Sequence, residues 1–253
     1  MFSEERGGVY RVRRSALGAI TLSERASPAP PTEEALALFR AEVLRAPWRA
    51  LSLEPAALRW LERVRWLVGE PAYVRQATLR GAPPVLEPWW GLLEGDALGG
   101  EVSERVRSLV EALCGEATLL RHLRGREVLP CLRGLTPLDE SSLVDRVAPE
   151  SFEVPTGQRV RVHYEVGRPP YISVYLQSFL GTPEHPLLGG VVPLQLHLLS
   201  PAQRPLQITS DLPSFWRNGY LDVRRELRAR YPKHHWPEDP LSVPPQRGAK
   251  RRF

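Results

Sequence analysis

Residues 205–240 read PLQITSDLPSFWRNGYLDVRRELRARYPKHHWPEDP, and they contain the clearest succession of local structural signals in the chain. Apolar and polar residues alternate over 206–208, which is typical of a short strand. Asp211 then stands where the N-cap of a helix is expected. Pro232 cannot continue a helix, because it lacks a backbone N–H. The stretch therefore predicts a strand, one amphipathic helix over 211–231 and an extended end.

The predicted helix has separate apolar and basic surfaces. Its apolar stripe recurs at steps of three and four residues and contains Trp216, Tyr220, Val223, Leu227 and Tyr231. At 100° per residue, Arg217, Arg224 and Arg228 fall within about 40° of one another, with Arg225 beside them. Such a helix packs its aromatic side on the protein and presents an arginine ridge to solvent.

Three segments upstream show the period-two alternation of half-buried strands. They lie at 160–164, 172–176 and 194–198. Together with the strand at 206–208, they predict a small antiparallel sheet. Pro193 stands at the start of one strand, and prolines are confined to edge strands, so we expect the 194–198 strand at an edge.

The first part of the chain predicts two short strands, at 9–13 and 19–23, which form a hairpin. Two strands alone are marginally stable, so they belong to a sheet that something else completes. The segment ASPAPPT at 26–32 reads as a proline-rich linker.

The middle of the chain is expected to be helical. Thr32 can cap a first helix, and a second begins at Pro55 and stops at Gly69. A third helix is expected near 101–113, and shorter helical pieces at 117–124 and 138–147. The fold class is therefore α+β, with an N-terminal strand pair, a helical middle segment, a small antiparallel sheet, a C-terminal amphipathic helix and an extended basic tail. The expected domains are residues 1–31, 32–150 and 151–253.

Basic-residue usage is unusual, because only Lys233 and Lys250 among the 34 basic residues are lysines. An arginine bias of this kind is typical of a GC-rich genome. Neither lysine follows a glycine, so the chain has no P-loop and no ATP-binding site of that type. ATP and Mg²⁺ are therefore not expected as cofactors of this chain.

Membrane and secretory signals are absent from the sequence. No apolar run approaches the ~18 residues of a membrane span, and the N-terminus has no apolar signal region. Cys114 and Cys131 do not make a disulfide framework. A cytoplasmic location is the expectation.

Charge is concentrated at the end of the chain. The net charge is +5, of which residues 204–253 carry +6 and all preceding residues −1. This asymmetry indicates nucleic acid or another polyanion as a partner. The alternative is a solvated tail that improves solubility.

Two kinds of catalytic or metal site find little support. Cys114, His122 and Cys131 are spaced eight and nine residues apart, whereas structural zinc ligands come in close pairs. No G-x-S-x-G elbow marks a nucleophilic serine. We therefore assign no catalytic and no metal-binding residues.

A nucleic-acid surface is the remaining candidate, because arginine binds phosphate bidentately and aromatic rings can stack on bases. Its predicted residues are Arg217, Arg224, Arg225, Arg228, Lys233, His234, Trp236, Lys250, Arg251 and Arg252. The alternative is structural: Trp216 and Tyr220 belong to the core, and Trp236 pins the tail onto the domain.

The segment RPLQITSDLPSFWRNGYLDVRRELRARYPKHHWPEDP at 204–240 resembles the C-terminus of bacterial HrpB-type helicases of the DEAH-box superfamily. The stretches VPTGQRVRVHY and VPLQLHLLSPAQRP resemble the preceding part of the same family. SALGAITLSERASPAP, near the N-terminus, resembles a stretch that follows the family's ratchet-type region. The resemblance thus covers nearly the whole chain, but only the C-terminal part of the family.

The resemblance implies an accessory region of an ATP-dependent RNA helicase. The family's P-loop, D-E-x-H and Q-x-x-G-R-x-G-R motifs are all missing here, so no catalytic residue can be transferred and the chain is not expected to be an enzyme on its own. The implied partners are helicase motor domains, in the same chain or separate, and single-stranded RNA. The chain is then a fragment, a split-gene product or a relative without a motor.

The alternative is a protein-interaction module. Its support is Trp89 and Trp90 beside Pro88, because exposed aromatic residues favour interfaces. If these residues are buried, they are simply core.

Overall fold

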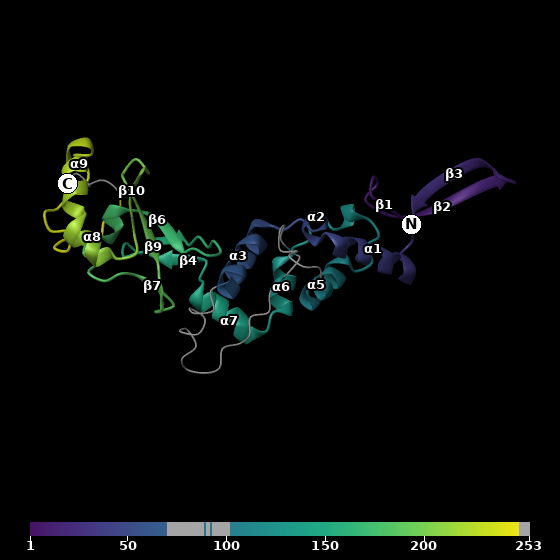
Figure 1. Ribbon diagram of the computed structural model, residues 1–253, viewed down its shortest axis with the longest axis horizontal. Helices are drawn as coiled ribbons and strands as arrows, with labels where there is room; N and C mark the ends of the chain where they lie inside the picture. Colours follow the sequence, from purple (N-terminus) through teal and green to yellow (C-terminus); the bar gives the residue numbers. More distant parts are fainter. Residues whose placement is uncertain (70–88, 90–91, 93–101, 248–253) are drawn as a thin grey trace. The chain divides into compact units, whose positions relative to one another are not determined.

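The computed structural model describes residues 1–69, 89, 92 and 102–247, and the chain forms two compact units (Figure 1). The first unit contains residues 1–61 and 87–138, and the second contains residues 62–86 and 139–253. The predicted division at residues 31 and 150 stays a prediction about domain boundaries. Among the described helices, none is both long and apolar enough to cross a bilayer.

The first unit begins with a three-stranded antiparallel sheet. Its strands are β1 (Phe2–Ser3), β2 (Gly8–Leu17) and β3 (Ile20–Pro28), in the order β1-β2-β3. The predicted hairpin is confirmed, and both long strands extend beyond their predicted ends. Gly18 begins the two-residue turn with φ of 61°, a left-handed conformation in which glycine has no steric penalty.

The base of this hairpin is packed tightly against a later segment. Val9 donates its N–H to the Thr118 carbonyl at 2.8 Å. A Cβ at Gly8 would lie 2.3 Å from Leu119 Cδ2, so only glycine fits there. The hairpin is therefore anchored at its base alone.

Helices form the core of the first unit. They are α1 (Glu33–Arg45), α2 (Pro47–Ala50), the start of α3 (Pro55–Gly69), α5 (Glu104–Cys114), the 3₁₀ turn η1 (Leu120–His122) and α6 (Leu129–Leu135). Thr32 and Ser103 cap α1 and α5 through their side-chain oxygens. The helix predicted over 117–124 shrinks to η1. Helix α6 was not predicted; its first N–H groups bond to the distant Glu54 carboxylate, a non-local cap.

The second unit holds α7 (Leu138–Val147) and several short strands. Strands β4 (Ser151–Glu153) and β5 (Arg159–Arg161) form one pair, and β7 (Leu187–Leu188) and β8 (Val192–Pro193) form another. A three-stranded sheet contains β6 (Tyr171–Tyr175), β9 (Gln195–Leu199) and β10 (Pro205–Thr209), in the order β10-β9-β6.

The topology of this sheet corrects three sequence predictions. The strand predicted at 160–164 is not part of it, because β5 pairs with β4 instead. β9 pairs antiparallel with β10 but parallel with β6, so the sheet is mixed, and β9 is its central strand. The 3₁₀ turn η2 (Leu176–Phe179) and the β7–β8 hairpin lie between β6 and β9, and this long connection returns the chain so that β9 runs parallel to β6. Pro193 belongs to β8 of the β7–β8 hairpin and not to β9. It therefore carries no information about whether β9 lies at an edge of the sheet.

The alternation predicted for these strands is confirmed. Ile172, Val174, Leu196 and Leu198 are at most 5% exposed and form the buried face of the sheet. Tyr171 and His197, on the other face, are half-buried and stack with ring centroids 4.3 Å apart.

The C-terminal helix is interrupted rather than single. It divides into α8 (Leu212–Asn218) and α9 (Tyr220–Arg230) at Gly219. Asp211 caps α8 as predicted, accepting the Ser214 N–H at 2.9 Å. A Cβ at Gly219 would approach the Phe215 ring to 3.0 Å, so the chain bends where the ring packs. The α+β class is confirmed overall.

Candidate nucleic-acid interface

The residues after α9 fold back onto the second unit, so the tail is anchored as far as Arg247. We call residues 231–247 the strap. Tyr220 Oη, fully buried in α9, donates to the Pro237 carbonyl at 2.8 Å. Trp236 is buried, and its Nε1–H donates to the Tyr231 carbonyl at 3.0 Å. These contacts fit the structural alternative for Trp236, and its nucleic-acid role stays a prediction.

The strap continues across the unit through backbone contacts. Gly181 donates its N–H to the Pro240 carbonyl at 2.8 Å, and Gln246 donates to Gln177 at 2.9 Å. Gly181 has φ of 73°, and a Cβ there would lie 2.5 Å from the Val243 carbonyl oxygen. Arg247 ends the strap by donating two N–H groups to the Thr156 carbonyl at 3.0 and 2.7 Å.

Arg224 belongs to this anchoring system. Its Nε donates to the Trp236 carbonyl at 3.0 Å and its Nη2 to Glu238 Oε1 at 3.1 Å. The side chain is only 17% exposed. Its nucleic-acid role stays a prediction, but the guanidinium already has two protein acceptors.

The remaining predicted cations differ in how far they are neutralised. Arg225 is 80% exposed and pairs with Asp222 at 3.1 Å. Arg217, Arg228 and Lys233 are exposed and form no ion pair with any residue that the structure describes. Arg230, in the last turn of α9, is also exposed, and the spacing argument missed it because it lies off the predicted ridge.

The interruption at Gly219 changes the predicted ridge. Arg217 lies on α8, whereas Arg224, Arg225 and Arg228 lie on α9. The angle calculated for one straight helix therefore holds only for the three arginines of α9.

His234 lies just past α9, with its ring edge-on to Tyr231 at 6.2 Å. Burial lowers the pKa of His234 below its usual value, so it is mostly neutral at pH 7. Lys250, Arg251 and Arg252 lie outside the described residues.

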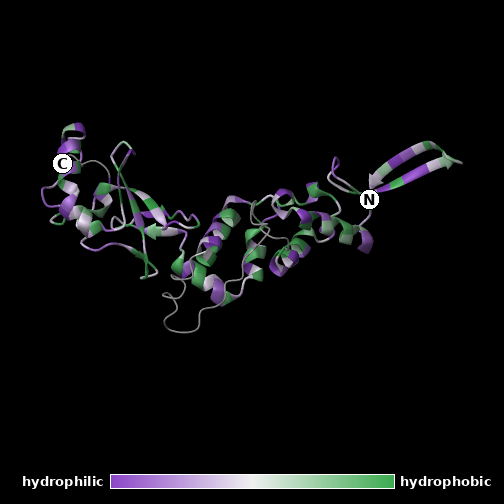
Figure 2. Cartoon of the chain, in the orientation of Figure 1, coloured by the Kyte–Doolittle hydropathy of each residue, from purple (hydrophilic) through white to green (hydrophobic). Residues whose placement is uncertain are grey.

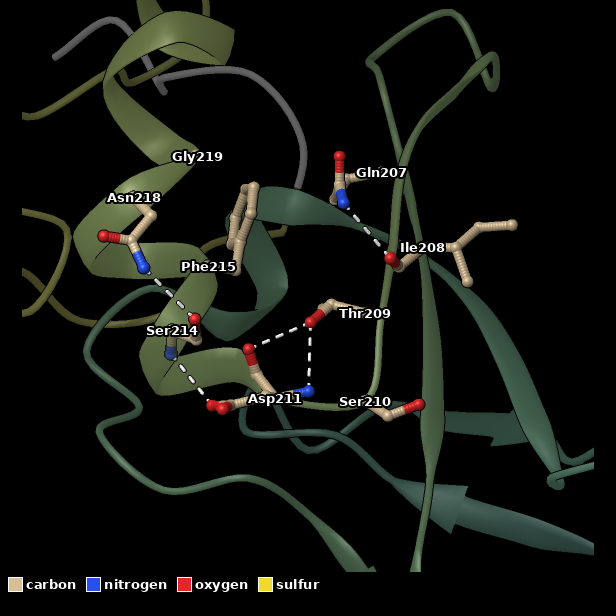
Figure 3. Close-up of a pocket in the computed structure, with 9 residues that line it drawn as sticks. All are labelled: Gln207, Ile208, Thr209, Ser210, Asp211, Ser214, Phe215, Asn218 and Gly219. Carbon is tan, nitrogen blue, oxygen red and sulfur yellow. Dashed lines mark hydrogen bonds between the residues drawn. The ribbon is translucent and has the colours of Figure 1, made fainter.

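A hollow of about 480 Å³ lies between β10 and α8 (Figure 3). Its polar side chains largely bond to one another or to nearby backbone: Thr209 Oγ1 donates to the Asp211 carbonyl, and Asn218 donates to Ser214 Oγ. Asp211 contributes a negative charge at its rim. The hollow therefore does not resemble a phosphate cradle.

The other sequence candidates are placed as follows. Cys114 is fully buried, and burial raises its pKa to about 11, so it is a neutral apolar group. The described residues bring no three potential metal ligands together. Trp89 is buried edge-on against Trp60 at 6.1 Å, which makes it a core residue. Pro88 and Trp90 lie outside the described residues.

Lys233, the lysine among the described residues, does not stand where a helicase-type ATP–Mg²⁺ site needs one. Lys233 follows Pro232 in the turn after α9, not a glycine-rich loop ahead of a helix.

Comparisons with known proteins find relatives of this chain. A family described as "ATP-dependent helicase C-terminal" matches residues 109–240. The chain is 43% identical over 133 residues to the ATP-dependent RNA helicase HrpB of Escherichia coli K12, which covers 52% of this chain and 16% of that protein.

Two crystal structures are similar in fold. The E. coli DExH-box NTPase HrpB aligns with a TM-score of 0.69 and 27% identity, over 96% of this chain and 28% of that one. A structure of the E. coli DEAH/RHA helicase HrpB aligns with a TM-score of 0.59 and 26% identity, over 89% and 26%. This chain thus spans less than a third of each relative.

Proposed function

The chain belongs to the ATP-dependent helicase C-terminal family, and from that premise we propose that it is the accessory C-terminal region of an HrpB-type RNA helicase, in which α8, α9 and the adjoining strap contact the RNA strand. The observation that carries this proposal is the contrast among the cations of that region. Arg224 is engaged by the protein, whereas Arg217, Arg228 and Lys233 are exposed without ion pairs to described residues.

The strap makes these cations suitable for binding. Trp236 and Tyr220 hold the backbone under them through buried hydrogen bonds. Binding costs less ordering entropy when the contact groups stand on a rigid support. Arginine in particular can bond a phosphate bidentately.

The test compares two triple variants of the full chain. Arg217, Arg228 and Lys233 are replaced by alanine in one. The matched control replaces Arg159, Arg161 and Arg168, which are exposed in the same unit but pair with Glu153, Glu62 and Glu165. Affinity for a fluorescent uridine oligonucleotide is measured across salt concentrations.

Each phosphate contact contributes about 0.7 to the log–log salt slope for single strands. The first variant is expected to lower the slope by about 2, and the control by much less. Equal losses in both variants would reduce the effect to net charge and refute the interface.

We further propose that ATP hydrolysis belongs to a motor region, in the same chain or separate. The support is the position of Lys233 and the missing motor motifs. The isolated chain is expected to release no phosphate from ATP, with or without RNA. RNA-stimulated release that survives purification to homogeneity would contradict this proposal.

A further inference from the structure

The β2–β3 hairpin is unusual in how little of it is buried. From Arg11 onward, every residue of β2 except the half-buried Val12 is exposed, and so is every residue of β3. Isolated two-stranded hairpins are marginally stable. The composition of its two exposed faces therefore indicates which kind of partner the hairpin binds.

One face of the hairpin is strongly basic. The register places Arg13 directly opposite Arg25 and Arg11 opposite Ser27. Directly opposite residues point to the same face of a sheet, and like charges in this position are destabilising. None of the three arginines forms an ion pair with any residue that the structure describes.

On the other face of the hairpin, the arginine is neutralised by an acidic residue of the neighbouring strand. Arg14 lies opposite Glu24, and the two form an ion pair with Nη2 and Oε2 2.9 Å apart. The chain thus neutralises one face of the hairpin and leaves the other with three uncompensated charges. Hydrophilic and hydrophobic residues both occur along the two strands, and the tip is apolar (Figure 2).

We propose that the Arg11–Arg13–Arg25 face is a second RNA-binding surface, which takes the phosphate backbone of a single strand. The choice of RNA as the polyanion rests on the proposed function. Arg11 and Arg13 are two residues apart on one strand, or about 7 Å, and Arg25 stands across from Arg13. Ser15, Ser23 and Ser27 lie at register positions on the same face and add hydroxyl donors of the kind that contact phosphates.

A bound strand removes the penalty of the Arg13–Arg25 opposition, because each phosphate neutralises one guanidinium. Uncompensated arginines are the expected composition of a surface selected for a polyanion rather than for stability. The exposed Leu17 and Ile20 at the tip, 70% and 67% exposed, are the feature that a protein partner would use instead.

The test is a matched pair of single variants, Arg13→Ala and Arg14→Ala, in the full chain. Each removes one positive charge from neighbouring positions of one strand, on opposite faces. Arg13→Ala is expected to weaken binding of a fluorescent uridine oligonucleotide about 5-fold near 0.1 M salt, with an unchanged or higher Tm. Arg14→Ala is expected to leave binding within about 2-fold and to lower the Tm slightly, because it breaks the pair with Glu24.

Three results would overturn the inference. Equal weakening in both variants would mean a net-charge effect, and unchanged binding in both would leave the face to another occupant, such as a protein on Leu17 and Ile20. A lower Tm for Arg13→Ala would make the arginine structural. If Arg13→Ala has no effect while the Arg217, Arg228 and Lys233 variant still loses affinity, this inference fails and the proposed function stands.

Discussion

Helix α9 with the strap, and the β2–β3 hairpin, each contain several arginines, yet they use them in opposite ways. Arg224 of α9 and Arg247 of the strap donate to the carbonyls of Trp236 and Thr156 and hold the strap in place. In the hairpin, Arg11, Arg13 and Arg25 have no acidic partner among the described residues, and two of them oppose each other. We interpret an arginine as structural where it donates to backbone carbonyls. We interpret it as a candidate ligand-binding residue where it is exposed and has no ion pair with a described residue.

The largest expected effect is at the centre of the strap. Replacing Trp236 with alanine removes a buried ring and its bond to the Tyr231 carbonyl. We expect a loss of about 3–5 kcal/mol in the free energy of unfolding, measured by urea denaturation. Lys233→Ala, three residues earlier and exposed, should stay within about 0.5 kcal/mol. Comparable small losses in both would mean that the strap is not anchored by its aromatic ring.

Arg224→Ala is the next most severe change. It removes the donor of the Trp236 carbonyl and the partner of Glu238. We expect a loss of about 1–3 kcal/mol, whereas Arg228→Ala on the same helix should change stability little. The order of the two variants should be reversed in RNA affinity, where Arg228→Ala is expected to have the larger effect. A stable Arg224→Ala variant with weakened binding would assign Arg224 to the RNA surface instead.

Several local elements of the fold followed from sequence, because nearby residues decide them. Asp211 and Thr32 marked helix starts, and the alternation around Ile172 and Leu196 marked a buried sheet face. The parallel β6–β9 pairing was missed because strand direction depends on the long connection between them, not on either strand. The cap of α6 was missed for the same reason, since Glu54 is distant in sequence.

The sequence could predict which residues make up the candidate site, but not which of its arginines bond to the protein itself. Spacing placed Arg224 and Arg228 on one side of a helix, which α9 retains. It could not show that Arg224 faces the returning strap, because that contact depends on the tertiary fold. The hairpin face could not have been found from sequence alone. A regular register continued from the Leu17–Ile20 pair would put Arg13 opposite Glu24, and the irregularity between Ser15 and Ala16 shifts its partner to Arg25.

A smaller effect is expected in the hairpin, with the opposite sign. Arg25→Glu replaces the Arg13–Arg25 opposition with an attractive cross-strand pair. We expect a gain of about 0.2–1 kcal/mol, seen as slower amide hydrogen exchange in β2 and β3. Arg14→Glu, which creates a like-charged pair with Glu24, should speed exchange. Slower exchange in neither or both variants would contradict the predicted faces.

The smallest expected effect is a difference between the strap and the hairpin in how they respond to acid. Burial lowers the pKa of His234 in the folded strap. Below about pH 6.5 the unfolded chain therefore binds more protons than the folded chain. The free energy of unfolding decreases as the pH is lowered, until the pH passes the folded-state pKa. The hairpin has no histidine and should be unaffected. Tryptophan fluorescence should report strap loosening as the pH falls below about 6.5, and His234→Gln should reduce it. A pH response that His234→Gln leaves unchanged would assign it to another group.

Crosslinking to RNA tests the central claim most directly, because it locates contacts without altering the protein. A single-stranded RNA containing 4-thiouridine is bound to the full chain, irradiated, and the attached peptides are identified by mass spectrometry. The account predicts crosslinked peptides from α9 and the start of the strap, around Tyr231 and His234, and a second set from β2 and β3. Crosslinks confined to other parts of the chain would contradict it.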